Sequence, residues 1–173
     1  MANWFWVFVF YSGAGCLLER ANAHGSTGED HPVRRCMRSL PLCPVYGLGV
    51  MAVLALPPSM RQGLWLPVAG AVVTTAVEFL YHWVCEAWLG VKFWDYSGVP
   101  GNLQGRVCVP FSLAWGGLTA LALWLLQPPL EAVIARIPPW LTLISLLIFT
   151  ADAVCTLRFL SVTHSVKALR NQA

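Results

Sequence analysis

The sequence predicts an all-α protein, a polytopic membrane bundle of about five transmembrane helices. Of the 173 residues, 57% are hydrophobic and only 11% are charged, whereas soluble domains have about 25% charged residues. The apolar residues form long runs that end at polar or proline-containing breaks. A soluble domain of this length buries at most about 70% of its surface, so it could not hide nine tryptophans and eight phenylalanines. Lipid is therefore the expected solvent.

Five apolar runs have the length of a membrane-spanning helix, about 20 residues. They cover residues 3–20, 44–60, 64–90, 107–127 and 139–163. The second run is the weakest, because the prolines at 57–58 shorten it, and a re-entrant segment is the alternative there. The proline pairs at 128–129 and 138–139 predict the end of the fourth helix and a short connection to the fifth. No other segment is large enough for a second domain, so we expect residues 1–173 to form one transmembrane domain.

The basic residues predict how this bundle is oriented. Of the eleven lysines and arginines, only Arg61 and Arg136 fall on one side of a five-helix topology, and the positive-inside rule places the richer side in the cytoplasm. We therefore expect a multi-pass protein of the cell inner membrane, with its N-terminus outside and its C-terminus in the cytoplasm. Because the basic residues are scattered between apolar runs, the sequence favours membrane lipid over nucleic acid as a partner.

Ionisable residues within the third run indicate a polar interior. Glu78, His82 and Glu86 are four residues apart, so they share one face of a helix. Burying an ionisable side chain in a span costs about 2.5–3.5 kcal/mol, so each needs a partner or a purpose. We expect this face to point inward, with Glu78 slightly to the cytoplasmic side of the bilayer centre and His82 hydrogen-bonded to a neighbouring acid.

Two other helices also carry an acid, Glu19 in the first and Asp152 in the fifth. Intramembrane acids often mark transport pathways. The alternative interpretation is structural, because buried acids can be held by arginines that only fix the packing of helices. Arg20, Arg106 and Arg158 are available for that role, and the sequence leaves both interpretations open.

The loop at residues 92–106, KFWDYSGVPGNLQGR, combines aromatic side chains, three glycines and charges, which indicates an ordered connection. Trp94 and Tyr96 are residue types that settle at the membrane interface. Asp95 and Arg106 add opposite charges next to Glu86. We therefore expect a charge cluster at the cytoplasmic mouth of the bundle.

The sequence predicts no metal and no cofactor. Four residues that could ligate a metal, His24, Glu29, Asp30 and His31, have no regular ligand spacing. The six cysteines contain no C-x-x-C pair, and Arg34, Arg35 and Arg38 fit a basic patch facing anionic lipid. Motifs for nucleotide binding, zinc hydrolysis and serine nucleophiles are absent from the sequence, so an ATPase that powered this protein would be a separate chain.

Four segments resemble the ABC-transporter permease family of the CmpB type. They read YSGAGCLLE at 11–19, CPVYGLG at 43–49, EFL at 78–80 and FWDYSGVPGNLQGRVC at 93–108. The resemblance implies functional positions at Glu19, Pro44, Tyr46, Gly47, Glu78, Trp94, Asp95, Tyr96, Ser97, Gly105 and Arg106. The chain departs from the family pattern at RSLPLCP, where relatives usually have a glycine-containing turn.

Three functions are compatible with these observations. The first is a permease-like transport component with an acidic polar cavity open to the cytoplasm. A chain of this size would need a homo-oligomer or a partner, with any ATPase on a separate subunit. The second is a membrane-embedded enzyme acting on a lipid or prenyl-type substrate, with Glu78 or Glu86 as general base and Arg106 holding a phosphate. The third is a non-catalytic accessory or sensor protein, which predicts a closed, fully paired cluster without a cavity.

Overall fold

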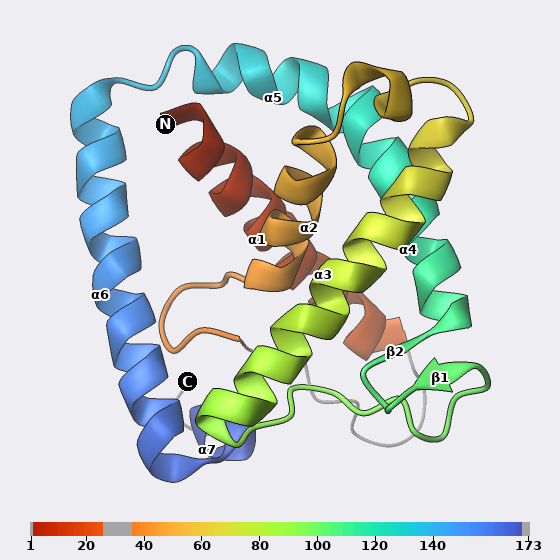
Figure 1. The fold of residues 1–173 in the computed structure, drawn as a ribbon. Helices are drawn as coiled ribbons and strands as arrows, with labels where there is room; N and C mark the ends of the chain where they lie inside the picture. The colour runs from red at the N-terminus through yellow and green to blue at the C-terminus, as the bar shows by residue number, and fades with distance from the viewer. Residues whose placement is uncertain (1, 26–35, 171–173) are drawn as a thin grey trace.

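The computed structural model describes residues 2–25 and 36–170, and helices dominate it (Figure 1). Along the chain lie α1 (Ala2–Gly25), α2 (Pro44–Leu54), the 3-10 turn η1 (Pro58–Arg61), α3 (Trp65–Leu89), β1 (Asn102–Leu103), β2 (Val107–Cys108), α4 (Val109–Leu121), the π-helical turn η2 (Ala122–Leu126), α5 (Gln127–Ile134), α6 (Pro139–Thr163) and α7 (Val166–Arg170). The strands β1 and β2 are two residues each and form one antiparallel hairpin. The predicted all-α class is confirmed.

Three helical stretches among the described residues are long and apolar enough to cross a membrane: Trp65–Leu89, Val109–Ile134 and Pro139–Thr163. Helix α1 has sufficient length, at 24 residues, but its tryptophans, glycines and charged end lower its hydropathy. Helix α2 has 11 residues, which span about 16 Å of a hydrocarbon core about 30 Å thick. The count of five spans and their orientation therefore stay predictions.

The expected helix bounds agree with the structure for α3 and α6 but differ for the other helices. Helix α1 continues to Gly25, beyond the expected end at residue 20. Helix α2 ends at Leu54 instead of continuing to residue 60, because Pro57 and Pro58 come shortly after it. The fourth helical stretch does not end before the prolines at 128–129. These prolines lie in the first turn of α5, where a missing backbone N–H costs nothing, and the π-helical turn η2 redirects the chain so that α5 crosses from α4 towards α6 (Figure 1).

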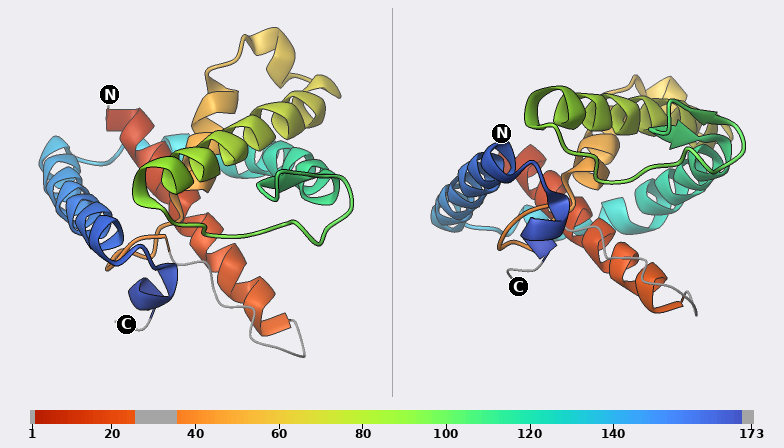
Figure 2. Two further views of the ribbon diagram at one scale, coloured as in Figure 1. Left: turned by 60° about the horizontal axis from the view of Figure 1, so that its bottom comes forward. Right: turned by 90° about the horizontal axis from the view of Figure 1, so that it is seen from below.

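Helices α1 to α4 pack together, and α6 stands beside them (Figures 1 and 2). Contacts between α6 and α1 are few and specific. The rings of Phe8 and Phe149 meet edge to face at 5.4 Å, and the Trp6 indole N–H donates to the Thr142 hydroxyl at 2.9 Å. Helix α6 is consequently the least buried of the three candidate spans, and Leu147 and Val162 lie on its outer surface.

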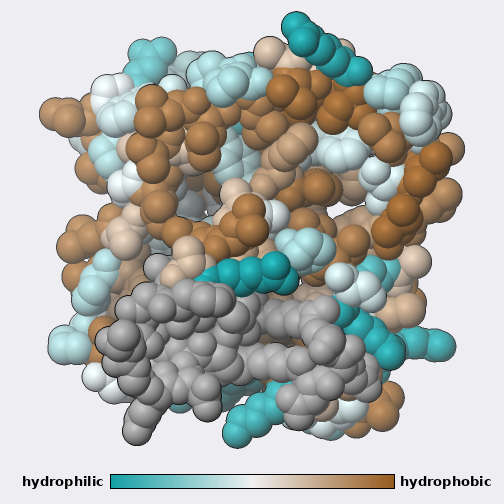
Figure 3. Space-filling view, turned by 180° about the vertical axis from the view of Figure 1, so that it is seen from behind, coloured by the Kyte–Doolittle hydropathy of each residue, from teal (hydrophilic) through white to brown (hydrophobic). Residues whose placement is uncertain are grey.

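The outer surface of the protein is apolar, whereas the side of α3 that faces the interior is polar. Apolar side chains gather over the upper half of the face in Figure 3. On α3, Leu80 and Trp83 are exposed, whereas Thr74, Glu78 and His82 are buried. The predicted polar face of this helix therefore does point inward, as a membrane environment requires.

Candidate functional site

Glu78 is the most deeply buried acid among residues 2–25 and 36–170, with 1% of its surface exposed. The Tyr96 hydroxyl donates a hydrogen bond to Glu78 Oε1 at 3.2 Å, and the Trp115 indole N–H donates to Oε2 at 2.8 Å. These donors come from the loop after α3 and from α4. Both carboxylate oxygens thus have a neutral donor, which offsets part of the cost of burying the group.

Glu19 joins the same arrangement through two aromatic rings. The Tyr46 hydroxyl donates to Glu19 Oε1 at 2.7 Å, and the Tyr46 ring lies 4.7 Å from the Trp115 ring, centroid to centroid. Glu19, Tyr46, Trp115, Glu78 and Tyr96 therefore form one connected group, which we call the acid–aromatic cluster. Each of the helices α1 to α4 contributes a member.

The start of α2 places Tyr46 in this cluster. Pro44 begins the helix, where its fixed φ angle and missing N–H fit the first turn. Gly47, one residue after Tyr46, packs against the backbone of Phe8 and the hydroxyl of Ser12 on α1. The P-x-Y-G segment therefore brings α2 close to α1 and directs the tyrosine between them.

A groove of about 190 Å³ lies beside the acid–aromatic cluster. Tyr46 and Trp115 form part of its wall, and it extends between α1, α2 and α4 as far as Tyr11 and Ala122. Its other lining residues are mostly apolar. Two rings that bind the acids thus also face an open space, which a purely structural ion-pair lock does not require.

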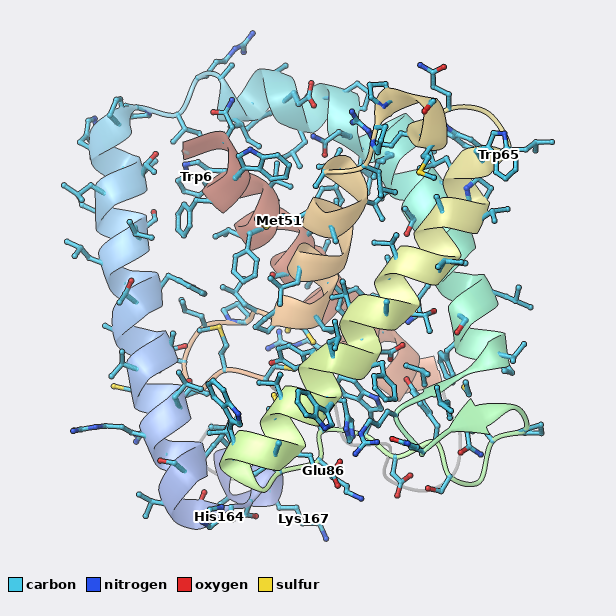
Figure 4. All side chains as sticks on the ribbon, in the orientation of Figure 1. Trp6, Met51, Trp65, Glu86, His164 and Lys167 are labelled. Carbon is cyan, nitrogen blue, oxygen red and sulfur yellow. The ribbon has the colours of Figure 1, made fainter. Side chains whose placement is uncertain are left out.

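A second group of charges surrounds Glu86 at the end of α3 (Figure 4). Arg106 Nη2 lies 2.8 Å from Glu86 Oε2, and Lys92 Nζ lies 3.2 Å from Oε1. Arg106 also bonds the Gln104 side chain and places its guanidinium 5.4 Å from the Phe79 ring centroid. Glu86 and Trp65 mark opposite ends of α3 in Figure 4, so this charge group lies at one end of the bundle.

His82 connects α3 to the loop after it. Its Nε2 lies 2.9 Å from the carbonyl oxygen of Trp94, so Nε2 carries the proton, because a carbonyl can only accept. The other ring nitrogen lies 3.8 Å from Glu86 Oε2. The Trp94 indole N–H in turn donates to the backbone carbonyl of Arg106 at 2.8 Å. The partner of the histidine is therefore a carbonyl and not the expected carboxylate.

The tip of the loop is held by Asp95. Its Oδ1 accepts from the Ser97 backbone N–H at 2.9 Å and from the Ser97 hydroxyl at 2.5 Å, while the Tyr96 N–H donates to the Gly105 carbonyl at 2.8 Å. Gly105 has φ +69°, and an added Cβ would lie 2.6 Å from both Asp95 Oδ1 and Ser97 Oγ. Only glycine fits there.

The two bonds from Ser97 lower the pKa of Asp95 below its ordinary value of 3.8. This ionised side chain should therefore stabilise the protein fully above pH 3.8, and its contribution should disappear as the pH falls through the lowered pKa. We expect the wild-type chain to melt at a higher temperature than Asp95→Asn at pH 7, and the difference to vanish in acid, where the protonated acid resembles the amide. Melting curves over a pH series measure this, and a difference that is constant with pH would contradict the assignment.

Asp152 lies apart from the other predicted residues. On α6, its two carboxylate oxygens accept backbone N–H bonds from Ser39 at 3.0 Å and Leu40 at 3.1 Å, and Thr156 accepts from the Arg38 N–H at 3.0 Å. The partners of Asp152 are thus backbone amides and not an arginine. This acid attaches the segment before α2 to α6.

Replacing Asp152 with alanine is expected to destabilise the protein by about 1–3 kcal/mol, because two partly buried N–H groups lose their acceptor. Hydrogen exchange at residues 39 and 40 should accelerate in the same variant. Thr150→Ala is the matched control, since Thr150 is exposed two residues earlier and bonds only within its own helix. Unchanged exchange at 39 and 40 would show that Asp152 does not hold this segment.

Sequence reasoning missed Trp115, which binds Glu78 and lines the groove. The available signal was an indole N–H in an apolar helix, because such a group needs an acceptor when buried. Of the residues considered as metal ligands, Glu29, Asp30, His31 and the side chain of His24 lie outside the described part, as do Arg34 and Arg35. Within residues 2–25 and 36–170, no three such ligands gather around a common point.

The long apolar helices and the buried acids define the class: a helical membrane protein with a polar, acid-containing interior. The model of the family described as "Putative ABC-transporter type IV" matches residues 6–157. The chain belongs to this family, which confirms the resemblance seen in its motifs. Comparisons with curated proteins and with solved structures found no match.

Proposed function

We propose that the protein is a permease-like component of a membrane transporter and that the acid–aromatic cluster forms the polar part of its pathway. Membership of the family and three helices of membrane-spanning character support a transport component. One observation carries the proposal further. Glu78, buried in a long apolar helix, is bonded by Trp115, and this tryptophan also lines the groove.

This geometry favours a pathway over a structural lock. A carboxylate deep in a span is costly, and packed apolar residues in place of a buried polar group and all its partners are often as stable or more stable. Here its donors are a tyrosine and a tryptophan next to an open groove, so small rotations of these rings can bring Glu78 or Glu19 into contact with a passing ligand. A lock needs no such space.

The proposed architecture is a single transmembrane domain over residues 1–173, with the N-terminus outside. The Glu86, Lys92 and Arg106 group then lies at the cytoplasmic mouth, where the pathway opens, and the groove beside the acid–aromatic cluster extends from the cluster towards the opposite end of the bundle. Helix α2 enters the membrane either as a short crossing or as a re-entrant segment. Because the chain is small for a complete pathway and lacks a nucleotide-binding motif, it works as a homo-oligomer with a separate ATPase subunit.

Cysteine accessibility tests whether the cavity contains water. The background chain carries Cys155→Ser, because Cys155 is exposed and the other five cysteines are buried. In inverted membrane vesicles, a charged thiol reagent is expected to modify Ala14→Cys, which lines the groove, because thiols react as thiolates in water. Leu147→Cys is the control, since Leu147 is 63% exposed on α6 and faces lipid. Equal protection of both positions would contradict the cavity, and modification of Ala14→Cys only from the outside would contradict the orientation.

Removing the charge of Glu78 tests the role of this acid in transport. Co-purification from native membranes is expected to recover the separate ATPase subunit. In proteoliposomes with this subunit, we expect ATP hydrolysis to fall to the rate of the ATPase alone for Glu78→Gln. Thr75→Ala, three residues away on the same helix, should keep the wild-type rate. Normal hydrolysis by a folded Glu78→Gln chain would remove this acid from the mechanism.

A membrane-embedded enzyme is the second candidate, on the strength of a different groove. This groove, about 610 Å³, lies between α3, α4 and the β hairpin, and Phe79 lines it beneath the Arg106 guanidinium. An acyl or prenyl chain would fit the groove with a phosphate at Arg106. A co-purified lipid that the wild-type chain converts, and Arg106→Gln does not, would favour the enzyme over the permease.

A further inference from the structure

A third cavity, of about 290 Å³, lies at the end of the bundle opposite Glu86. This cavity is partly open, and it is bordered by the first turns of α1, the end of α2, the turn η1 and helix α5. Its polar and aromatic lining residues are Asn3, Trp4, Arg61, Gln127 and Glu131, and its apolar ones include Leu54 and Ile134. None of these residues belongs to the acid–aromatic cluster or to the group around Glu86.

Arg61 and Glu131 bring opposite charges to this cavity without pairing with each other. Within the described part of the chain, neither residue forms an ion pair at 4.0 Å or less. The Nε atom of Arg61 is buried and has no hydrogen-bond partner among the described residues. A buried donor without a partner is costly, and two opposite charges held apart match a ligand that carries both.

Glu131 is held in place from the interior. The Gln127 side-chain amide donates to Glu131 Oε1 at 2.9 Å, and Gln127 itself accepts from the Tyr11 hydroxyl at 3.0 Å. Glu131 is exposed, whereas Gln127 is only 7% exposed, so the carboxylate is accessible to a ligand and the inner end of this chain of bonds is protected from solvent. It begins at η2, where Tyr11 also bonds the carbonyl of Ala122 at 3.3 Å, and π-helical turns are frequent at functional sites.

We propose that this cavity binds a small zwitterion. Its anionic group, a carboxylate or phosphate, bonds Arg61, while its ammonium group lies against the Glu131 carboxylate and the Trp4 indole, whose face attracts cations. The ligand is a free zwitterionic solute or the headgroup of a zwitterionic phospholipid, because both carry the same pair of charges. The site lies at the opposite end from the acid–aromatic cluster, and the proposal does not depend on transport.

Binding is measured by titrating phosphocholine into the full-length chain in a non-ionic detergent. The wild-type chain is expected to bind it, and Arg61→Gln and Glu131→Gln should each weaken binding at least about tenfold, the effect of losing one charge-assisted contact. Arg136→Gln is the matched control, because Arg136 is an exposed arginine in the connection after α5. Absence of binding by the wild-type chain, or equal binding by the folded Arg61→Gln and Glu131→Gln chains, would overturn the proposal.

Single-charge ligands and a charge reversal test the ligand class independently of folding. Choline and inorganic phosphate, each with one of the two charges, should bind at least about tenfold more weakly than phosphocholine. Glu131→Lys should reverse this preference in favour of inorganic phosphate, and a retained preference for phosphocholine would refute zwitterion recognition. Nanodiscs identify the source: a headgroup site binds added phosphocholine in phosphatidylglycerol but not in phosphatidylcholine, whereas a solute site binds it in both.

Discussion

Replacing Glu78 with alanine is expected to lower the free energy of unfolding by about 2–6 kcal/mol. The reason is that the Tyr96 hydroxyl and the Trp115 indole N–H both lose their acceptor, and each unsatisfied buried donor costs about 1–3 kcal/mol. Glu78→Gln should cost about half as much, because its amide oxygen can still accept one bond while its amide nitrogen faces the other donor. Thermal unfolding in detergent should rank the chains wild type, Glu78→Gln and Glu78→Ala, from most to least stable.

Thr75→Ala provides the control on the same helix. The Thr75 hydroxyl is buried and has no partner among the described residues, so its removal should leave the melting temperature close to that of the wild type. Equal melting temperatures for Glu78→Ala and Thr75→Ala would mean that Tyr96 and Trp115 do not depend on the acid.

Gly15→Ala is the second substitution with a large expected effect. A Cβ at this position would overlap the Tyr46 ring and would lie only 2.7 Å from the Cβ atom of Tyr46. Because the overlap includes the Tyr46 Cβ atom, whose position is fixed by the backbone, a rotation of the ring cannot relieve it and α2 must move. Overpacking of this kind costs about 1–3 kcal/mol, and the variant should also lose the Tyr46–Glu19 bond.

Gly13→Ala is the matched control, two residues earlier on α1. There an added Cβ meets only Leu42 Cδ2 at 3.8 Å, an ordinary contact, and alanine favours a helix over glycine by up to about 1 kcal/mol. Melting temperatures should therefore move in opposite directions, down for Gly15→Ala and slightly up for Gly13→Ala. A decrease of similar size in both would show that α1 tolerates no added volume at all, and would remove Tyr46 as the cause.

The sequence allowed the polar face of α3 to be predicted, because the spacing of Glu78, His82 and Glu86 depends only on helix geometry. The connection between Glu86 and Arg106 could also be anticipated, since the two residues flank one loop. Partners that come from other helices could not. Trp115 lies 37 positions after Glu78, and no local pattern encodes that contact.

The prolines explain why the end of the fourth helix was predicted wrongly. The pair at 128–129 can end one helix or begin the next, because the same lack of an N–H permits both. The new helix follows directly on η2, a π-helical turn whose first carbonyl, that of Ala122, also accepts a hydrogen bond from Tyr11 on α1. Local sequence therefore located the break in the helix, and tertiary contacts determined that a new helix begins directly after the break.

The π-helical turn η2 also determines how far α5 is rotated about the helix axis relative to α4. If the same residues formed an α-helix instead, everything after them would rotate by roughly 100° relative to α4, because a π-helical turn takes up one residue more than an α-helical turn. Gln127 and Ile134, both buried in the structure, would then turn away from the interior together. Residues 122–126 should accordingly accept many apolar substitutions over evolutionary time as long as the π-helical turn is kept, so that the geometry of this segment is constrained more tightly than its composition.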